Sequence, residues 1–228
     1  MMHDGERVVR ETTRHGWLIK RHIFMPFIVL IGCDGSGKSA VISEVSEQLR
    51  TQGINVSCGH WRPKAFARSS QGTVAATVDD PHGRPSRGLA TSVLKLGWLW
   101  LNWWVAWWTG LRKASRNGVV LFDRFHGDLW VDPKRYLYGG PLWLARMATQ
   151  IMPQPDLILF LDAPPEVLLT RKQEVSRGAL ENSRRRYLEL GRRYRRFLII
   201  DVTQPLEQVV EVVMERIKDA RRMDATFH

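Results

Sequence analysis

Short apolar runs alternate with amphipathic stretches along this chain. Apolar runs lie at residues 27–31, 118–123, 156–162 and 197–201, and residues 54–58 alternate between apolar and polar side chains. Continuous apolar runs of this length are typical of strands buried on both faces of a parallel sheet. The pattern therefore predicts about five strands.

Helical periodicity fills the intervals between these runs. The first predicted helix has one apolar face, made of Val41, Ile42, Val45 and Leu49, and Gly53 follows it as a candidate C-terminal cap. Another helix with apolar positions at 206, 209, 210, 213 and 217 follows the last strand. Strands separated by helices predict an α/β fold, a doubly wound parallel sheet with helices on both faces.

The remaining segments set the expected domain limits. Residues 1–22 are polar and mixed, and we interpret them as an N-terminal extension that could be partly helical. Residues 59–90 are rich in Gly, Pro, Arg and Ser and indicate a long loop. We expect one domain over residues 23–222, followed by a tail at 223–228.

A glycine-rich turn after the first strand carries the clearest chemistry. Residues 32–39 read GCDGSGKS and match G-x-x-x-x-G-K-[ST] at every fixed position. Glycines let the backbone N–H groups surround a phosphate, and the following helix directs its positive end there. The expected ATP-binding residues are Gly32, Asp34, Gly35, Ser36, Gly37, Lys38, Ser39 and Ala40. Lys38 would contact the outer phosphates, and the Ser39 hydroxyl would bind Mg²⁺. This pattern indicates a P-loop NTPase.

A second charged pair, Asp123 and Arg124, ends the third predicted strand. The carboxyl ends of parallel strands line the ligand crevice of such sheets. A carboxylate there could hold Mg²⁺ or orient an acceptor, and the arginine could bind a phosphate with two hydrogen bonds. We expect Ser39 and Asp123 to bind the metal ion. We expect Asp34, Asp123 and Arg124 to bind the acceptor.

Composition adds two constraints. The formal net charge of +11 suits polyanionic partners such as nucleotide phosphates, nucleic acid or an anionic membrane. No recognisable nucleic-acid-binding module accompanies it. Two cysteines, Cys33 and Cys58, form no disulfide framework, which favours a reduced, cytoplasmic setting.

The ordered set of motifs resembles the thymidylate kinase family of P-loop nucleotide kinases. Residues 32–39 are similar to its P-loop, residues 123–125 (DRF) to its Asp-Arg-aromatic motif, and residues 155–166 to a later strand and turn. Residues 131–141 and 171–174 resemble a thymidylate-kinase-like branch found in bacterial cell-envelope polysaccharide gene clusters. The resemblance implies a kinase that uses ATP and Mg²⁺.

The same resemblance implies further site residues. Arg171 falls where the family begins its arginine-bearing lid, here expected at about 171–186, and Arg171 would act in catalysis and ATP binding beside Lys38, Asp34, Asp123 and Arg124. Gln204 and Pro205 fall in the segment beside the adenine. Arg177 is the next candidate for the lid, and for the remaining arginines of this region a solvated helix face is the simpler interpretation.

The two segments that would bind the acceptor differ from those of the family. Its Arg-Glu-Pro-Gly-Gly loop is replaced by residues 60–64 (HWRPK), in which only Arg62 and Pro63 could correspond. Its base-reading helix is replaced by residues 94–110, LKLGWLWLNWWVAWWTG. This segment could be a helix buried in the core or in a homodimer interface, an apolar acceptor pocket, or an interfacial membrane helix over Trp98–Trp108.

Three functions remain open at this point. The first is phosphoryl transfer from ATP to a small acceptor, a nucleoside monophosphate such as dTMP. The second is a kinase for a sugar, lipid or other envelope precursor, with Asp123 or Asp34 as base if the acceptor is an alcohol. The third is an ATP-binding regulatory subunit without turnover.

Overall fold

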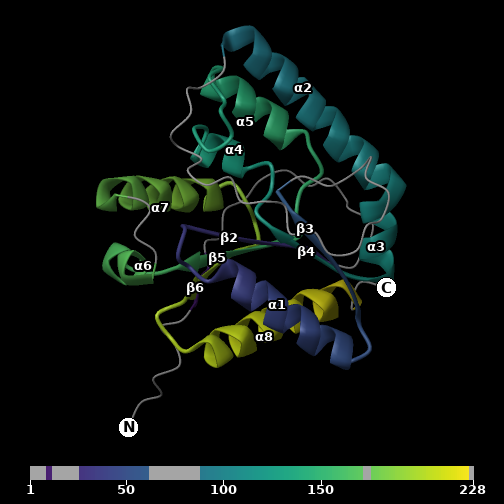
Figure 1. Ribbon diagram of the computed structural model, residues 1–228. Coiled ribbons are helices and arrows are strands. Elements are labelled where there is room, and N and C mark those ends of the chain that lie inside the picture. Colours follow the sequence, from purple (N-terminus) through teal and green to yellow (C-terminus); the bar gives the residue numbers. More distant parts are fainter. Residues whose placement is uncertain (1–8, 12–25, 62–87, 172–175, 226–228) are drawn as a thin grey trace. The chain divides into compact units, whose positions relative to one another are not determined.

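The computed structural model describes residues 9–11, 26–61, 88–171 and 176–225; the rest is grey in Figure 1. The chain divides into two compact units. Unit 1 comprises Met1–His60, Ala114–Arg124 and Pro155–His228, and unit 2 comprises Trp61–Lys113 and Phe125–Gln154. The predicted domain at 23–222 therefore includes parts of both units.

Unit 1 contains the sheet. Its parallel strands are β2 (Phe27–Gly32), β3 (Asn55–His60), β4 (Gly118–Asp123), β5 (Leu157–Asp162) and β6 (Phe197–Asp201). Their order is β6-β5-β2-β4-β3, so β2 lies in the middle with β4 and β5 on either side. Every residue of β2 is buried, as its apolar run predicts. The five expected strands and the α/β, P-loop NTPase fold are confirmed.

The N-terminal extension contributes a sixth strand. β1 (Val9–Glu11) pairs antiparallel with β6 at the edge of the sheet. The sequence pattern did not predict this strand, and the other residues of the extension lie outside the described residues. The edge of β6 offers backbone N–H and C=O groups that only an extended segment can pair in register.

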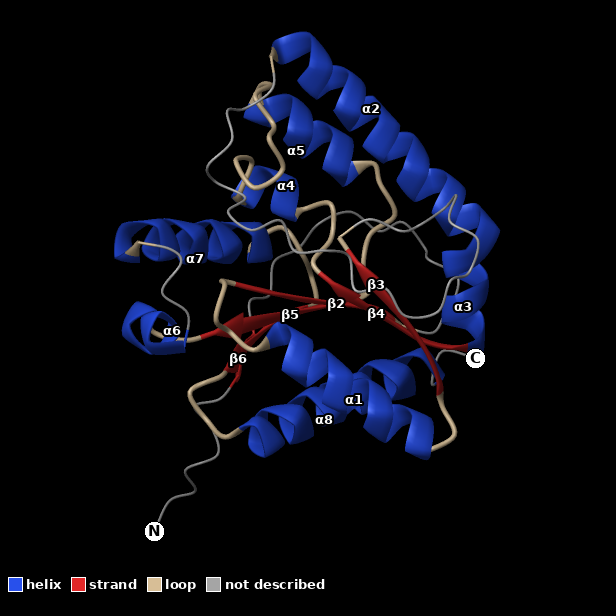
Figure 2. Ribbon diagram, in the orientation of Figure 1, coloured by secondary structure: helices blue, strands red, loops and turns tan. Residues whose placement is uncertain are grey.

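Helices cover the sheet of unit 1 on both faces. α1 (Lys38–Thr51) and α8 (Leu206–Ala225) pack together on one face, and α7 (Arg177–Gly191) lies on the other (Figure 2). α6 (Pro165–Arg171) follows β5. Gly53 ends α1 as expected, with φ 74° and an N–H that donates to the Arg50 carbonyl.

Two details of α8 differ from the sequence prediction. Leu206, expected on its buried face, is 40% exposed because it is the first residue of the helix. The helix also extends to Ala225, into the segment that we expected to be a tail. Val209, Val210, Val213 and Ile217 are buried as predicted.

Unit 2 is helical. It contains α2 (Leu89–Ala106), a π-helical turn η1 (Trp107–Leu111), the start of α3 (Arg112–Asn117), α4 (Asp128–Val131) and α5 (Leu142–Gln150). α2 and α5 lie side by side. Trp103 of α2 is fully buried, and its ring meets the His126 ring edge to face at 5.0 Å. The core of unit 2 therefore contains the buried side chains of Trp103 and His126 in direct contact.

His126 makes the stability of the protein depend on pH. Its side chain is fully buried, and burial lowers its pKa from 6.5 to about 4, partly opposed by a hydrogen bond between Nε2 and the Pro153 carbonyl at 3.0 Å. The unfolded chain therefore binds more protons than the folded protein between these pH values, and stability falls as pH falls from 6.5 towards 4. We expect the unfolding free energy to be about 2 kcal/mol lower at pH 5 than at pH 7 from this group.

Urea denaturation at several pH values would measure this effect. His126→Gln keeps a donor for the Pro153 carbonyl but does not titrate, so the decrease from pH 7 to pH 5 should shrink. His60→Gln is the matched control, because the His60 side chain is exposed. A pH dependence identical in the wild type and His126→Gln would contradict the assignment to His126.

Candidate functional site

The glycine-rich turn connects β2 to the N-terminus of α1. Gly35 and Gly37 have φ angles of 85° and 79°, in the left-handed region that side-chain-bearing residues seldom adopt. α1 begins at Lys38, directly after Gly37. The N–H groups of its first turn, which find no acceptor within a helix, and the positive end of its dipole therefore lie at this turn. Such an arrangement is suited to binding an anion.

Lys38 places a buried positive charge inside the turn. Its ammonium donates to the carbonyls of Gly32 and Cys33 at 3.0 and 2.9 Å, and to Ser36 Oγ at 3.3 Å. Because the loop's own oxygens hold the ammonium, its position is defined before any phosphate arrives. A cation held in place in this way is suited to stabilising the negative charge of a phosphate.

Arg124 is fixed at the end of β4 by both its backbone and its side chain. It is buried and has a φ of 66°, and its N–H donates to the Leu30 carbonyl at 2.9 Å. Its guanidinium donates to Asp34 Oδ1 and to the Tyr187 hydroxyl, both at 2.8 Å. Left-handed backbone in a non-glycine residue costs about 1–3 kcal/mol and is found mainly at functional sites. The structure thus joins the P-loop, β4 and α7 through one arginine.

Asp123 and Ser39 line a shared cavity of about 340 Å³ in unit 1. Asp123 Oδ1 is buried, and among the described residues no hydrogen-bond partner for it is found. Its Oδ2 lies 3.8 Å from Nε2 of His60. A carboxylate oxygen without a partner in the described residues, in the same cavity as a serine hydroxyl, suits Mg²⁺, which prefers oxygen ligands and keeps several waters. The two predicted metal residues therefore line one cavity.

Cys33 of the P-loop is a packing residue. Burial raises the pKa of its thiol to about 11, although the positive charges of Lys38 and Arg124 partly oppose this. The thiol donates weakly to the Leu180 carbonyl at 3.8 Å. It stays protonated near neutral pH, so it is not an activated nucleophile.

The arginines of α7 differ in part from the sequence prediction. Arg184, expected on a solvated face, makes a two-point ion pair with Asp162 at the end of β5, with both N···O distances at 2.7 Å. Arg177 is exposed and pairs with Glu166 and Glu181. Arg171 is exposed at the end of α6, and residues 172–175 of the predicted lid lie outside the described residues.

Three further residues were predicted for the site, Arg62, Gln204 and Pro205. Gln204 and Pro205 are exposed in the turn between β6 and α8. Arg62 lies outside the described residues. The sequence reasoning missed Tyr187 and Asp162, the partners of Arg124 and Arg184. Both pairs join residues distant in the chain, and no local pattern marked them.

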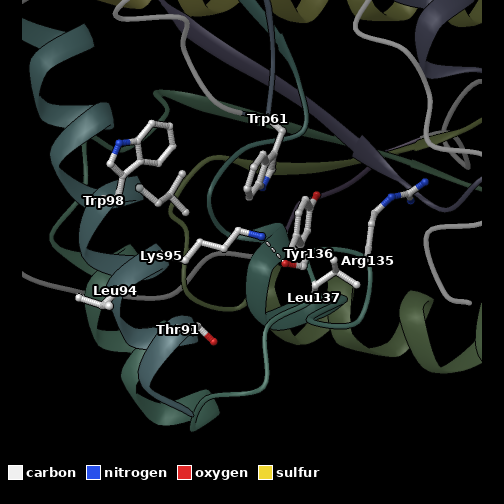
Figure 3. A pocket seen from close by; sticks show the side chains of 9 residues that line it. Trp61, Thr91, Leu94, Lys95, Trp98, Arg135, Tyr136 and Leu137 are labelled. Carbon is white, nitrogen blue, oxygen red and sulfur yellow. Dashed lines mark hydrogen bonds between the residues drawn. The ribbon is translucent and has the colours of Figure 1, made fainter. Parts of the chain in front are cut away.

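Unit 2 has a cavity of its own, of about 610 Å³ (Figure 3). Trp61 and Tyr136 stack on one side, with ring centroids 4.3 Å apart and an interplanar angle of 12°. Lys95 and Trp98 of α2 project towards it, and Lys95 donates to the Tyr136 carbonyl. Arg135 adds a second cation to the lining. The cavity therefore combines aromatic surfaces with positive charge, a composition suited to an apolar or aromatic molecule that carries an anionic group.

The tryptophan-rich segment forms α2 and η1 and has one buried and one exposed face. One face of α2 is buried in the core of unit 2 through Leu96, Leu99, Trp103 and Ala106. The opposite face is exposed, and Leu94 and Trp98 also line the cavity. Across the described helices, none is long and apolar enough to cross a membrane.

A central parallel strand, a glycine-rich turn at its carboxyl end and a buried lysine at the start of the next helix define a P-loop NTPase. One family comparison agrees with this class. Residues 112–213, just under half of the chain, match the family model described as thymidylate kinase. The match supports a relationship to the thymidylate kinase family. It also supports a kinase activity, that is, phosphoryl transfer that involves nucleotides. It includes Asp123 and Arg124 but not the P-loop, so the two observations are independent.

Proposed function

We propose that this protein is an ATP- and Mg²⁺-dependent kinase that phosphorylates a small acceptor. The observation that carries the proposal is the charged constellation of unit 1, in which Lys38, Asp34 and Arg124 are held by short hydrogen bonds at the ends of β2 and β4. Fixed positive charges at the carboxyl ends of parallel strands are what phosphoryl transfer needs, since its catalysis is mostly positioning and electrostatic stabilisation.

Each residue has a proposed role. The turn from Gly32 to Ala40 would bind the ATP phosphates with its N–H groups, with Lys38 on the outer phosphates. Ser39 and Asp123 would hold Mg²⁺, which when bound neutralises phosphate charge. Arg124 would stabilise the transferring group, with Asp34 and Tyr187 keeping its guanidinium in place. Arg171 would supply a further cation from the lid, and Gln204 and Pro205 would lie beside the adenine.

The ion pair of Asp34 affects the choice of base. Because Asp34 accepts from Arg124 at 2.8 Å, its charge is already neutralised, and Asp123 is the better base if the acceptor is an alcohol. A nucleoside monophosphate needs no strong base, since its phosphate oxygen is already a nucleophile. With a nucleoside monophosphate as acceptor, Asp123 would therefore only help to hold Mg²⁺. With an alcohol as acceptor, it would also act as the base.

We assign acceptor binding to the aromatic cavity of unit 2. A kinase for dTMP must recognise a base edge through hydrogen bonds, whereas this cavity is lined largely by Trp61, Trp98, Tyr136 and leucines. Its Lys95 and Arg135 would suit an anionic group on the acceptor. This composition favours an apolar phosphorylated compound, in keeping with the resemblance to proteins of polysaccharide gene clusters.

We therefore expect the protein to be a poor thymidylate kinase. An apolar pocket cannot reproduce the discrimination of a site that hydrogen-bonds a base. Steady-state kinetics with dTMP should give a kcat/KM well below about 10⁴ M⁻¹s⁻¹, the lower end of the ordinary enzyme range. A value at or above that level would refute this prediction.

A screen of acceptors by ATP-dependent phosphorylation tests the proposed function as a whole. Nucleoside monophosphates, sugar phosphates and phosphorylated lipid alcohols are the classes to include. Acceptor-dependent ADP release with one of them would support the kinase. Tight ATP binding without ADP release for any acceptor would instead favour a regulatory subunit.

A further inference from the structure

Unit 2 presents an apolar stripe along the whole of α2 and η1. Leu94, Trp98, Leu101 and Trp108 are exposed, from 48% to 73%, and they recur at the three-, four- and seven-residue spacings of one helix face. The half-buried Val105 lies in the same row. Large apolar side chains this exposed and this contiguous are rare on a monomer without a partner.

The neighbouring helix exposes a second apolar row. Trp143, Met147 and Ile151, at four-residue spacing along α5 and its C-terminal end, are each more than half exposed. α5 lies alongside α2 in unit 2 (Figure 1). We name the exposed side chains of α2, η1 and α5 the tryptophan face.

The charged residues of the helices that carry the tryptophan face have one sign. Residues 89–113 contain no Asp or Glu, and they end in Arg112 and Lys113. The Arg112 guanidinium lies 4.9 Å from the centre of the Trp108 ring. The only charged residue of α5 is Arg146. Indole rings beside arginine are a combination that suits the headgroup level of a bilayer, where tryptophan is enriched and anionic lipids attract cations.

We propose that the tryptophan face lies flat on an anionic membrane surface. The buried face of α2 packs within unit 2 through Trp103, so only the outer face of α2 is available to lipid. A helix of this kind binds in the plane of the interface. A second copy of the chain is the poorer occupant, because an isologous contact would bring more cations and no acid from these helices. A bilayer offers phosphate groups and an apolar layer together.

Membrane binding by the tryptophan face would decide where the protein works and does not depend on turnover. It is expected whether the acceptor is a lipid, a sugar phosphate or a nucleotide, and it can be measured without ATP. Failure of membrane binding would leave the proposed kinase untouched, and absence of kinase activity would leave the membrane proposal untouched.

Flotation of the full chain with vesicles tests the proposal. We expect binding to phosphatidylcholine vesicles that contain phosphatidylglycerol, and much weaker binding to phosphatidylcholine alone. Leu101→Gln with Trp108→Gln, both outside the cavity lining, should lower the partition coefficient by about tenfold or more, since two exposed apolar side chains are removed. Arg112→Gln and Lys113→Gln should each lower it by about fivefold on anionic vesicles.

Two measurements keep the outcome clear. Leu206→Gln removes an exposed apolar side chain from α8 of unit 1 and should leave vesicle binding unchanged. Circular dichroism of each variant verifies the fold. No binding of the wild type to anionic vesicles at low salt would overturn the proposal. So would sedimentation showing a dimer that Leu101→Gln with Trp108→Gln converts to monomer, because the face would then be occupied by a second copy.

Discussion

Replacing Lys38 with alanine is expected to lower ATP turnover by a factor on the order of 10² to 10³, as loss of one preorganised donor does in other enzymes. The ammonium is buried in the P-loop, where it donates to the carbonyls of Gly32 and Cys33 and to Ser36 Oγ. Its removal therefore takes a positive charge from the phosphate site and leaves the sheet intact. ADP release with a saturating acceptor measures the effect.

The control for this variant is Lys218→Ala. Lys218 is an exposed lysine on α8, so its loss should change neither turnover nor melting temperature. Calorimetric titration with ATP would separate weaker binding from slower chemistry. If Lys38→Ala kept wild-type turnover and an unchanged melting temperature, the P-loop assignment would be untenable.

The second large effect is expected for Arg124→Gln. Loss of an arginine that stabilises the transferring phosphoryl group lowers kcat by about 10³-fold or more in related chemistry. The same change leaves Asp34 without its cation and the Tyr187 hydroxyl without its donor, which should cost about 1–3 kcal/mol of stability. Both kcat and the unfolding free energy must therefore be measured.

Tyr187→Phe distinguishes positioning from chemistry. It removes one contact of the guanidinium and keeps the ion pair with Asp34 at 2.8 Å. We expect a much smaller fall in kcat than for Arg124→Gln, with ATP affinity unchanged. Equal falls in kcat for the two variants would mean that orientation by α7 matters as much as the charge. Wild-type kcat for Arg124→Gln would remove Arg124 from the mechanism.

The strands were predictable from sequence because their signal is local. A run such as 118–123 is buried on both faces, so its composition alone identifies it, and β4 has the predicted bounds. The P-loop was predictable because phosphate binding requires glycines and lysine at fixed spacing. Asp123 and Arg124 followed from their position at a strand end.

Long-range pairs could not be predicted in the same way. Arg124 and Tyr187 are 63 residues apart, and Arg184 and Asp162 are 22 apart. Arginine is common around α7, and nothing in the local sequence distinguishes Arg184, which pairs with Asp162, from its solvated neighbours. The sequence also could not predict which face of α2 is exposed, because a segment that is apolar on all sides does not show which side packs inward.

The division of the chain into two units has a consequence for the history of this protein. Unit 2 consists of two segments of the chain. Trp61–Lys113 lies between β3 and β4, and Phe125–Gln154 lies between β4 and β5. Substitutions in these segments change no residue of the parallel strands or of the P-loop, all of which belong to unit 1. With ATP bound by unit 1 and the acceptor by unit 2, as proposed above, a lineage could exchange one acceptor for another and still inherit the same phosphate-binding residues.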